Sequence, residues 1–429
     1  MIGREITRRR FMKVTAAGTI ASLAAPAVIR AAPANAKGIV RIGHVTPLTG
    51  PSAAFGEPYP YVLKYIQERL KDGISIGGEP WAVEILSRDS QSSANRAAEV
   101  ASELILRDEV NLMLCLSTPD CVNPVSDQAE INGVPCISTN CPWQPYVFGR
   151  NGEPVKGFEW TYHFFWGLED ATQGYVGLWN STSTNRIVGA LITNDADGNA
   201  WNNKADPGAL RQTCARNNFE LIVADGITVG AQDFSAQIAL FKSRNVEIVT
   251  GVLYPPDFGI FWQQCAQQNF RPKIVTIAKA LLFPSVISAL GDSGDGLSTE
   301  IWWSPHHPFK SGLTGQTAKD FAAGYTSETG RPWTQPMGFN HALFEVAIDV
   351  LQRTKDVQDP ASILESIKAT DYNSIVGHIK WDNPNLKNIA KTSVVAGQWT
   401  KTPDGFDLIV CDNFNNRDIP IGGKLRPLA

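Results

Sequence analysis

The chain has 429 residues, of which 43% are hydrophobic and 19% are charged. That length exceeds one ordinary core and suits two lobes, and the composition is globular rather than disordered. A formal net charge of −4 at pH 7, with no basic patch along the chain, argues against a nucleic-acid-binding role.

Residues 1–36 are expected to form a twin-arginine signal peptide that is removed from the mature protein. The segment Thr7-Arg8-Arg9-Arg10-Phe11-Met12-Lys13 closely resembles the twin-arginine export signal, and the mildly apolar stretch Val14–Ile29 follows it. Ala34-Asn35-Ala36 has the small-x-small pattern of a cleavage site. A membrane anchor is the alternative, but the stretch is short, rich in alanine and interrupted by Pro26. We therefore expect export to the periplasm by the twin-arginine pathway.

After the leader, strands and helices alternate. Apolar runs predict strands buried on both faces, and apolar residues at helical spacing predict the helices between them. The expected elements are a strand at Ile39–Val45, a helix at Tyr59–Lys71, a strand at Trp81–Ser87, a helix at Ala94–Arg107, a strand at Asn111–Leu116, a helix at Pro124–Ile131 and a strand at Val134–Ser138. This order implies a parallel sheet with right-handed crossovers.

An irregular aromatic insertion at Cys141–Trp166, ending in a crossing strand at Glu159–Phe165, separates this series from a second one. The second series has helices at Ala171–Ser181, Asn203–Asn217, Phe234–Arg244 and Phe258–Gln268, with strands at Arg186–Thr193, Leu221–Asp225, Val246–Val252 and Lys273–Ile277. The rest has helices at Pro284–Leu290, Thr317–Thr329, Pro336–Lys355 and Ile363–Lys368, with strands at Leu297–Trp303, Val376–Trp381 and Thr392–Trp399. We expect two parallel sheets whose segments interleave through several crossings.

Two polar loops follow neighbouring strands of the first predicted sheet. Ser117-Thr118-Pro119-Asp120 comes directly after one strand, and Thr139-Asn140-Cys141 comes directly after the next. Parallel strands point both loops toward the same edge of the sheet, and ligands of open α/β sheets bind at that carboxyl edge. The sequence therefore predicts a ligand site there.

The seven cysteines, at positions 115, 121, 136, 141, 214, 265 and 411, leave at least one thiol unpaired. Buried free thiols are one interpretation, and short disulfides joining Cys115 to Cys121 or Cys136 to Cys141 are another. Zinc is disfavoured because neither pair has CxxC spacing and no histidine is close in sequence. His306 and His307 would point opposite ways on an extended chain, so we expect no metal there. The sequence has no cofactor fingerprint, so we expect no cofactor.

Further landmarks occur in a characteristic order along the chain: Ile42-Gly43, Leu48-Thr49-Gly50-Pro51 with Phe55-Gly56, Arg88-Asp89-Ser90, Leu114–Thr118, Val134–Ser138 and Val376–Asp382. In these the chain resembles the branched-chain amino-acid type of ABC-transporter periplasmic substrate-binding proteins. The resemblance implies an α/β fold of two Rossmann-like lobes with parallel sheets joined by three crossover strands, the type I periplasmic-binding fold. The expected division is 37–165 plus 301–376 in the first lobe, and 166–300 plus 377–429 in the second.

The resemblance also implies a ligand held in the cleft between the lobes. Carried over position by position, its contacts fall on Phe55, Ser117, Thr118, Asn140 and Cys141 in the first lobe, and on Asp197, Tyr254 and Lys279 in the second. Seven of them have a plainer alternative: Ser117-Thr118 as a helix cap, Asn140 and Asp197 as turn residues, Phe55 and Tyr254 as packing residues, and Lys279 as a solvent-facing cation.

Two of these positions depart from the amino-acid-binding pattern of the family, and so does Pro142, next to Cys141. Pro142 replaces a common threonine and removes a donor, Asp197 replaces an aromatic residue, and Lys279 or Ala280 replaces an acidic residue that meets the ligand's ammonium. A lysine beside the ligand would repel an ammonium and attract an acid. We therefore expect an organic acid, an amide or an aromatic acid rather than a simple branched-chain amino acid.

The sequence thus predicts a monomeric periplasmic component of an ABC importer, which binds a small polar solute by hinge closure and delivers it to membrane permease subunits. A ligand sensor for a signalling receptor is one alternative. An exported enzyme is another, but GxSxG, HExxH, P-loop and GxGxxG motifs are all missing. Trp143, Trp166, Trp302 and Trp303 are expected in the core or rim, and indoles in the cleft would favour a flat aromatic ligand.

Overall fold

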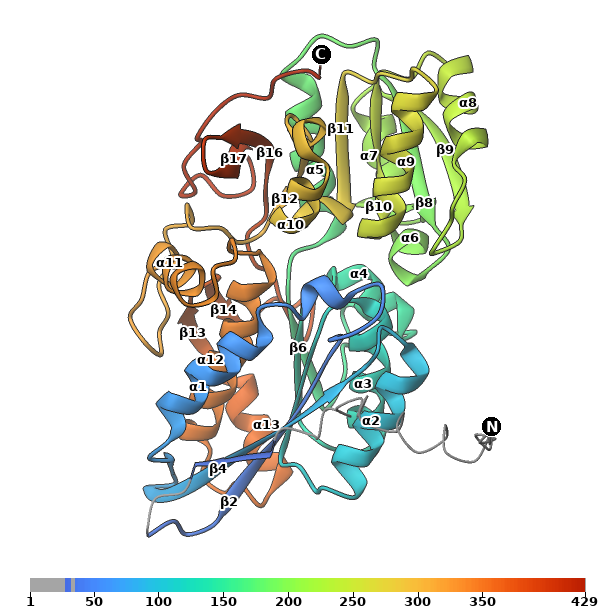
Figure 1. Ribbon diagram of the computed structural model, residues 1–429. Helices are drawn as coiled ribbons and strands as arrows, with labels where there is room; N and C mark the ends of the chain where they lie inside the picture. The colour runs from blue at the N-terminus through green and yellow to red at the C-terminus, as the bar shows by residue number, and fades with distance from the viewer. Residues whose placement is uncertain (1–27, 32–34, 429) are drawn as a thin grey trace, which may run out of the picture.

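The computed structural model describes residues 28–31 and 35–428 and divides them into two α/β lobes, one above the other in Figure 1. Each lobe is built on one large, mostly parallel sheet. The chain crosses between the lobes after Phe164, after Ile301 and after Ala390, where successive strands belong to different sheets. The predicted α/β class with two lobes and three crossings is confirmed.

The first lobe has an eight-stranded sheet in the order β1-β4-β2-β5-β6-β7-β15, with β3 paired to β4. From β4 to β15 in this order, neighbouring strands are parallel, while β1 and β3 pair with β4 antiparallel. The strands are β1 (Val28–Ala31), β2 (Ile39–Thr46), β3 (Ile74–Ile76), β4 (Glu79–Asp89), β5 (Leu112–Leu116), β6 (Cys136–Thr139), β7 (Thr161–Phe164) and β15 (Ile389–Ala390).

Helices cover both faces of this sheet. Alternation along β5 sends Leu112 and Leu114 to the core shared with α1 and α12, and Met113 and Cys115 to the core shared with α2 and α3. The helices are α1 (Tyr59–Leu70), α2 (Ala94–Leu106), α3 (Pro119–Asn132), α4 (Trp143–Gly149), α11 (Ala318–Thr329), α12 (Pro336–Arg353) and α13 (Pro360–Lys368), and a hairpin is formed by β13 (Asp371–Ser374) and β14 (Gly377–Lys380).

The second lobe has a seven-stranded sheet in the order β17-β16-β12-β11-β10-β8-β9. Its strands from β9 to β12 are parallel, and β16 and β17 extend the edge antiparallel. The elements are α5 (Leu168–Asn180), β8 (Ile187–Thr193), α6 (Ala196–Trp201), α7 (Leu210–Arg216), β9 (Glu220–Ile227), α8 (Ser235–Ser243), β10 (Ile248–Leu253), α9 (Pro255–Gln267), β11 (Ile274–Lys279), α10 (Pro284–Ala289), β12 (Ser298–Ile301), β16 (Val395–Thr402) and β17 (Gly405–Asp412).

Local sequence signals place α3, which borders the predicted ligand edge. Thr118 is its N-cap and Pro119 its first residue, where the missing proline N–H costs no hydrogen bond. The helix ends at Asn132 and is capped by Gly133, whose φ of 65° suits glycine, so the predicted break at Asn132-Gly133 is confirmed. Pro124 lies inside the first turns and does not end the helix.

The structure corrects several boundaries. Residues 377–390 do not join the second lobe, because β14 pairs with β13 and β15 pairs with β7 of the first sheet. The predicted helix at 203–217 is shorter in the structure: only α7, Leu210–Arg216, is helical, because Pro207-Gly208 interrupts the segment before it. The insertion at 141–166 contains α4, and the unpredicted strand β17 pairs with β16.

The predicted signal peptide is described only in part. Val28–Ala31 forms the edge strand β1 beside β4, and the twin-arginine segment lies outside the described residues. Across the ranges that the structure covers, no helix combines the length and the apolar character required to cross a membrane.

Candidate functional site

A small cavity of about 40 Å3 lies between the two lobes. It sits at the carboxyl ends of β5, β6, β10 and β11, as expected for open α/β sheets. The first lobe contributes Phe55, Thr118, Asn140 and Pro142, the crossing segments contribute Phe165, Trp166 and Trp302, and the second lobe contributes Asp197, Trp201, Val252, Ala278, Lys279, Leu282 and Glu300. Both lobes therefore enclose the same space.

The structure brings most of the predicted contacts together around this cavity. Phe55, Thr118, Asn140, Asp197 and Lys279 line it. The other three predicted residues do not line it: Ser117, Cys141 and Tyr254 each contact a lining residue or its neighbour. These three residues therefore support the residues that line the cavity and do not line it themselves.

The two polar loops of the first lobe are held by each other. Asn140 Nδ2 donates a hydrogen bond to Ser117 Oγ at 3.2 Å, which ties the end of β6 to the end of β5. Both residues have positive φ, 53° for Ser117 and 59° for Asn140, a conformation that non-glycine residues adopt rarely and mostly in turns and functional loops. The Thr118 side chain makes no capping hydrogen bond to α3, so the helix-cap interpretation of that hydroxyl is wrong.

A buried ion cluster forms the second-lobe side of the site. Lys279 Nζ lies 2.6 Å from Asp197 Oδ2 and 3.3 Å from Asp195 Oδ2, and the three side chains are only 5%, 7% and 9% exposed. The ammonium also lies 4.2 Å from the centre of the Tyr254 ring. Lys279 is therefore neither solvent-facing nor a free positive charge beside the cavity.

Burial and neighbouring charges shift the pKa values of the carboxyl groups in and beside this cluster. Burial raises the pKa of Asp197 to about 6, helped by the charges of Asp195 and Asp120 and opposed by Lys279. Burial likewise raises the pKa of Asp120, on the first lobe, against the attraction of Lys279. The pKa of Asp195 is lowered, since Lys279 and the hydrogen bond from the Gly198 N–H outweigh its burial. The cluster thus joins charges from both lobes.

Glu300 is a further carboxyl group of the cavity wall, on β12. It is buried, and it accepts hydrogen bonds from the Tyr175 hydroxyl and, at 2.9 Å, from the Thr299 hydroxyl. Burial raises the pKa of Glu300, although these donors oppose the shift. Within the described residues no cation pairs with Glu300. Its signal in the sequence is a lone acidic residue directly before the apolar run Ile301-Trp302-Trp303.

Aromatic rings form much of the remaining wall. Trp166 and Trp302, expected in the core or rim, line the cavity, and Phe165 packs edge-on against Trp302 with ring centres 5.3 Å apart. Trp303 is core, and its Nε1 donates to the Ile375 carbonyl oxygen. Phe55 of the first lobe meets Phe283 of the second edge-to-face at 5.0 Å, so the lobes are in contact across the cleft.

Four buried polar atoms of the lining side chains have no hydrogen-bond partner among the described residues. They are Oδ1 of Asn140, Oδ1 of Asp197, and Nε1 of Trp166 and Trp302. An unpaired buried polar group costs about 1–3 kcal/mol, so native proteins rarely leave one without a reason. A bound solute with both donors and acceptors would pair with these atoms.

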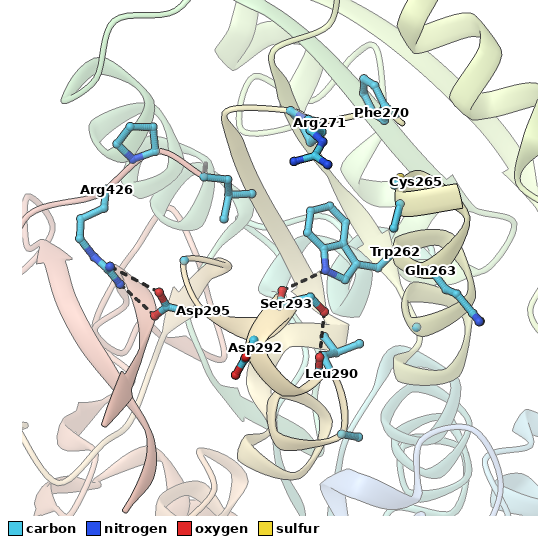
Figure 2. A pocket seen from close by; sticks show the side chains of 17 residues that line it. Trp262, Gln263, Cys265, Phe270, Arg271, Leu290, Asp292, Ser293, Asp295 and Arg426 are labelled. Carbon is cyan, nitrogen blue, oxygen red and sulfur yellow. Dashed lines mark hydrogen bonds and ion pairs between the residues drawn. The ribbon is translucent and has the colours of Figure 1, made fainter. Parts of the chain in front are cut away.

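A larger hollow of about 930 Å3 lies in the second lobe, between α9, α10 and the C-terminal segment (Figure 2). Some of its polar groups are paired with one another. Trp262 Nε1 donates to the Ser293 carbonyl oxygen at 2.9 Å, and Arg426 Nη2 donates to Asp295 Oδ1 at 2.9 Å. It involves one lobe only, so we take the smaller cavity as the functional site.

The cysteines are all free thiols. Six are buried and Cys411 is half-buried, so the disulfide interpretation of Cys115 with Cys121 and of Cys136 with Cys141 is wrong. Burial raises the pKa of the Cys121 thiol to about 12, which keeps it protonated and unreactive. The described ranges contain no group of three or more side chains able to hold a metal ion.

Comparison with known families gives one match that covers most of the chain. A family described as periplasmic binding protein matches residues 39–403. Among individual proteins, Leu/Ile/Val-binding protein homolog 3 from Brucella melitensis biotype 1 is 25% identical over 281 residues, which are 66% of this chain and 68% of that protein.

Solved structures are similar over a greater length. A leucine binding protein from Thermotoga maritima has a TM-score of 0.69 and 20% identity, covering 87% of this chain and 99% of that chain. The solute binding protein of an ABC transporter from Rhodopseudomonas palustris BisB5, in complex with 3,4-dihydroxybenzoic acid, has a TM-score of 0.70 and 18% identity, covering 90% of this chain and 99% of that chain. At these identities the likeness establishes the fold.

Proposed function

Because the chain belongs to the periplasmic binding protein family, we propose that it is the solute-binding component of an ABC importer. It binds a small polar organic solute between its lobes and delivers the solute to membrane permease subunits. The organic acids, aromatic acids and amides expected from the sequence belong to this class of solute, and so do amino acids. The protein acts as a monomer in the periplasm, after export by the twin-arginine pathway.

One observation carries the proposal: a cavity at the carboxyl ends of strands from both sheets is walled by side chains from both lobes. Thr118 and Asn140 come from the first lobe, and Asp197 and Glu300 come from the second. A solute that touches both walls binds the closed form better than the open form. It therefore shifts the population toward closure by its difference in affinity for the two states. The closed shape is what the permease recognises, and no covalent step is needed.

Scattering and mass spectrometry test this proposal together. Native mass spectrometry of protein isolated from the periplasm should show a non-covalently bound small molecule. Small-angle scattering should then show a decrease in the radius of gyration when that molecule is added back to dialysed protein. A profile that stays the same, together with chemical conversion of the molecule, would contradict the proposal and favour an enzyme.

A further inference from the structure

The charges of the cavity wall are unbalanced. Asp195 and Asp197 share the single ammonium of Lys279, so this trio carries one more negative than positive charge when all three are ionised. Glu300 adds a buried carboxyl group with no cation beside it in the described part of the chain, and Asp120 faces the trio from the first lobe. The wall is therefore negative or, at most, neutral.

Lys279 has little left to offer an anion. Two of its N–H groups face carboxylates, at 2.6 and 3.3 Å, and its remaining side faces the Tyr254 ring at 4.2 Å. A ligand carboxylate placed there would approach Asp195 and Asp197 as well as the ammonium. Like charges in a site of low dielectric constant repel strongly, so the wall disfavours an acid.

The other features of the wall suit a cation. Oδ1 of Asp197 and Oδ1 of Asn140 are acceptors without partners, one from each lobe. Trp166, Trp201 and Trp302 line the same space, and aromatic rings attract ammonium and guanidinium groups that lie over their faces. Nε1 of Trp166 and of Trp302 are donors that a neutral oxygen of the solute can satisfy.

From this arrangement we infer that the cavity takes a small organic cation: a protonated amine or amidinium that carries a neutral oxygen acceptor and no carboxylate. The inference rests on the proposed solute-binding function and narrows it. It replaces the expectation that Lys279 selects an acid, because Lys279 is already neutralised by the two aspartates. The cavity volume of about 40 Å3 restricts the solute to a few non-hydrogen atoms in this closed form.

A matched series of four small molecules tests which sign of ligand charge the cavity prefers. Glycinamide, glycolamide, glycolate and glycine have the same number of non-hydrogen atoms, and are a cation, a neutral molecule, an anion and a zwitterion. Isothermal titration of the dialysed mature protein near neutral pH should give glycinamide the highest affinity. Glycolate should bind at least about tenfold more weakly, a difference of about 1.4 kcal/mol. Equal or tighter binding of glycolate or glycine, or no detectable binding of glycinamide, would overturn the inference.

Variants locate the effect in the cluster. Asp197→Asn removes the excess negative charge of the trio. Glycinamide should therefore bind about tenfold more weakly, a loss of about 1.4 kcal/mol in binding free energy, while glycolate should bind more tightly. Asp225→Asn is the control, because it removes an exposed charge from the edge strand of the same lobe. If Asp197→Asn loses its folded circular-dichroism spectrum, Glu300→Gln should shift the preference in the same direction. An unchanged preference in a folded variant would refute the assignment.

Scattering separates this inference from the proposed function. If glycolate binds best and closes the lobes, the charge assignment is wrong while the solute-binding function stands. If neither the four molecules nor a periplasmic small-molecule extract changes the radius of gyration, the solute-binding function itself is wrong.

Discussion

The substitution Lys279→Met should cost this protein a large part of its stability. The side chain keeps a similar length, but Asp195 and Asp197 lose the ammonium that lies 3.3 and 2.6 Å from them. All three side chains are less than a tenth exposed, so water cannot compensate. Removing one partner of a buried ion pair typically costs about 3–5 kcal/mol, because the other charge stays buried without a partner.

Urea unfolding at two pH values measures this cost and its cause. The pKa of Asp197 is raised from 3.8 to about 6 by burial, so the folded protein favours the neutral carboxyl group. The stability that Asp197 contributes is therefore present in acid and lost as the pH rises through about 6. Without Lys279 its pKa rises further. The loss in Lys279→Met should thus be greater at about pH 8 than at about pH 5.

Two further variants make the test specific. Lys64→Met breaks the Lys64–Glu328 pair, whose side chains are 71% and 48% exposed, and should cost no more than about 1 kcal/mol. Adding Asp197→Asn to Lys279→Met should recover part of the lost stability, because one unpaired charge is removed. The reasoning fails if Lys279→Met unfolds within about 1 kcal/mol of wild type at the higher pH, or if its loss is the same at both pH values.

Three other measurements follow from the structure. Glycinamide affinity, measured by titration calorimetry, should fall as the pH is lowered through about 6, because Asp197 takes up a proton; a flat profile would contradict its role. Phe55→Ala removes the edge-to-face contact with Phe283 at 5.0 Å, a contribution of about 0.5–1.5 kcal/mol to closure, so the radius of gyration without solute should increase. Thiol titration of unfolded, unreduced protein should detect all seven cysteines as free thiols, and fewer than seven thiols would indicate a disulfide. In the folded protein, Cys411 should be the most accessible of the seven thiols.

Most of the fold could be predicted because it depends on local patterns. The buried run at 112–116, the polar loop after it and the glycine at 133 define β5, its carboxyl end and the end of α3 without reference to distant residues. The last crossing was misplaced because the strand signal at 376–381 does not say which sheet it joins. Among the described residues that strand, β14, pairs only with β13, and the chain stays in the first lobe until β15 has paired with β7, more than 200 residues away in sequence.

The sequence by itself determined two α/β lobes and the sheet edge at which Thr118 and Asn140 lie, since apolar runs and polar loops encode strand ends locally. Only the tertiary structure decided the character of the site. Trp166 and Trp302 reach the cavity because two crossing segments pass side by side, and Lys279 loses its free charge because β11 carries it to the N-terminus of α6. Charge balance in a buried site depends on neighbours in space, and Lys279 and Asp195 are 84 residues apart in sequence.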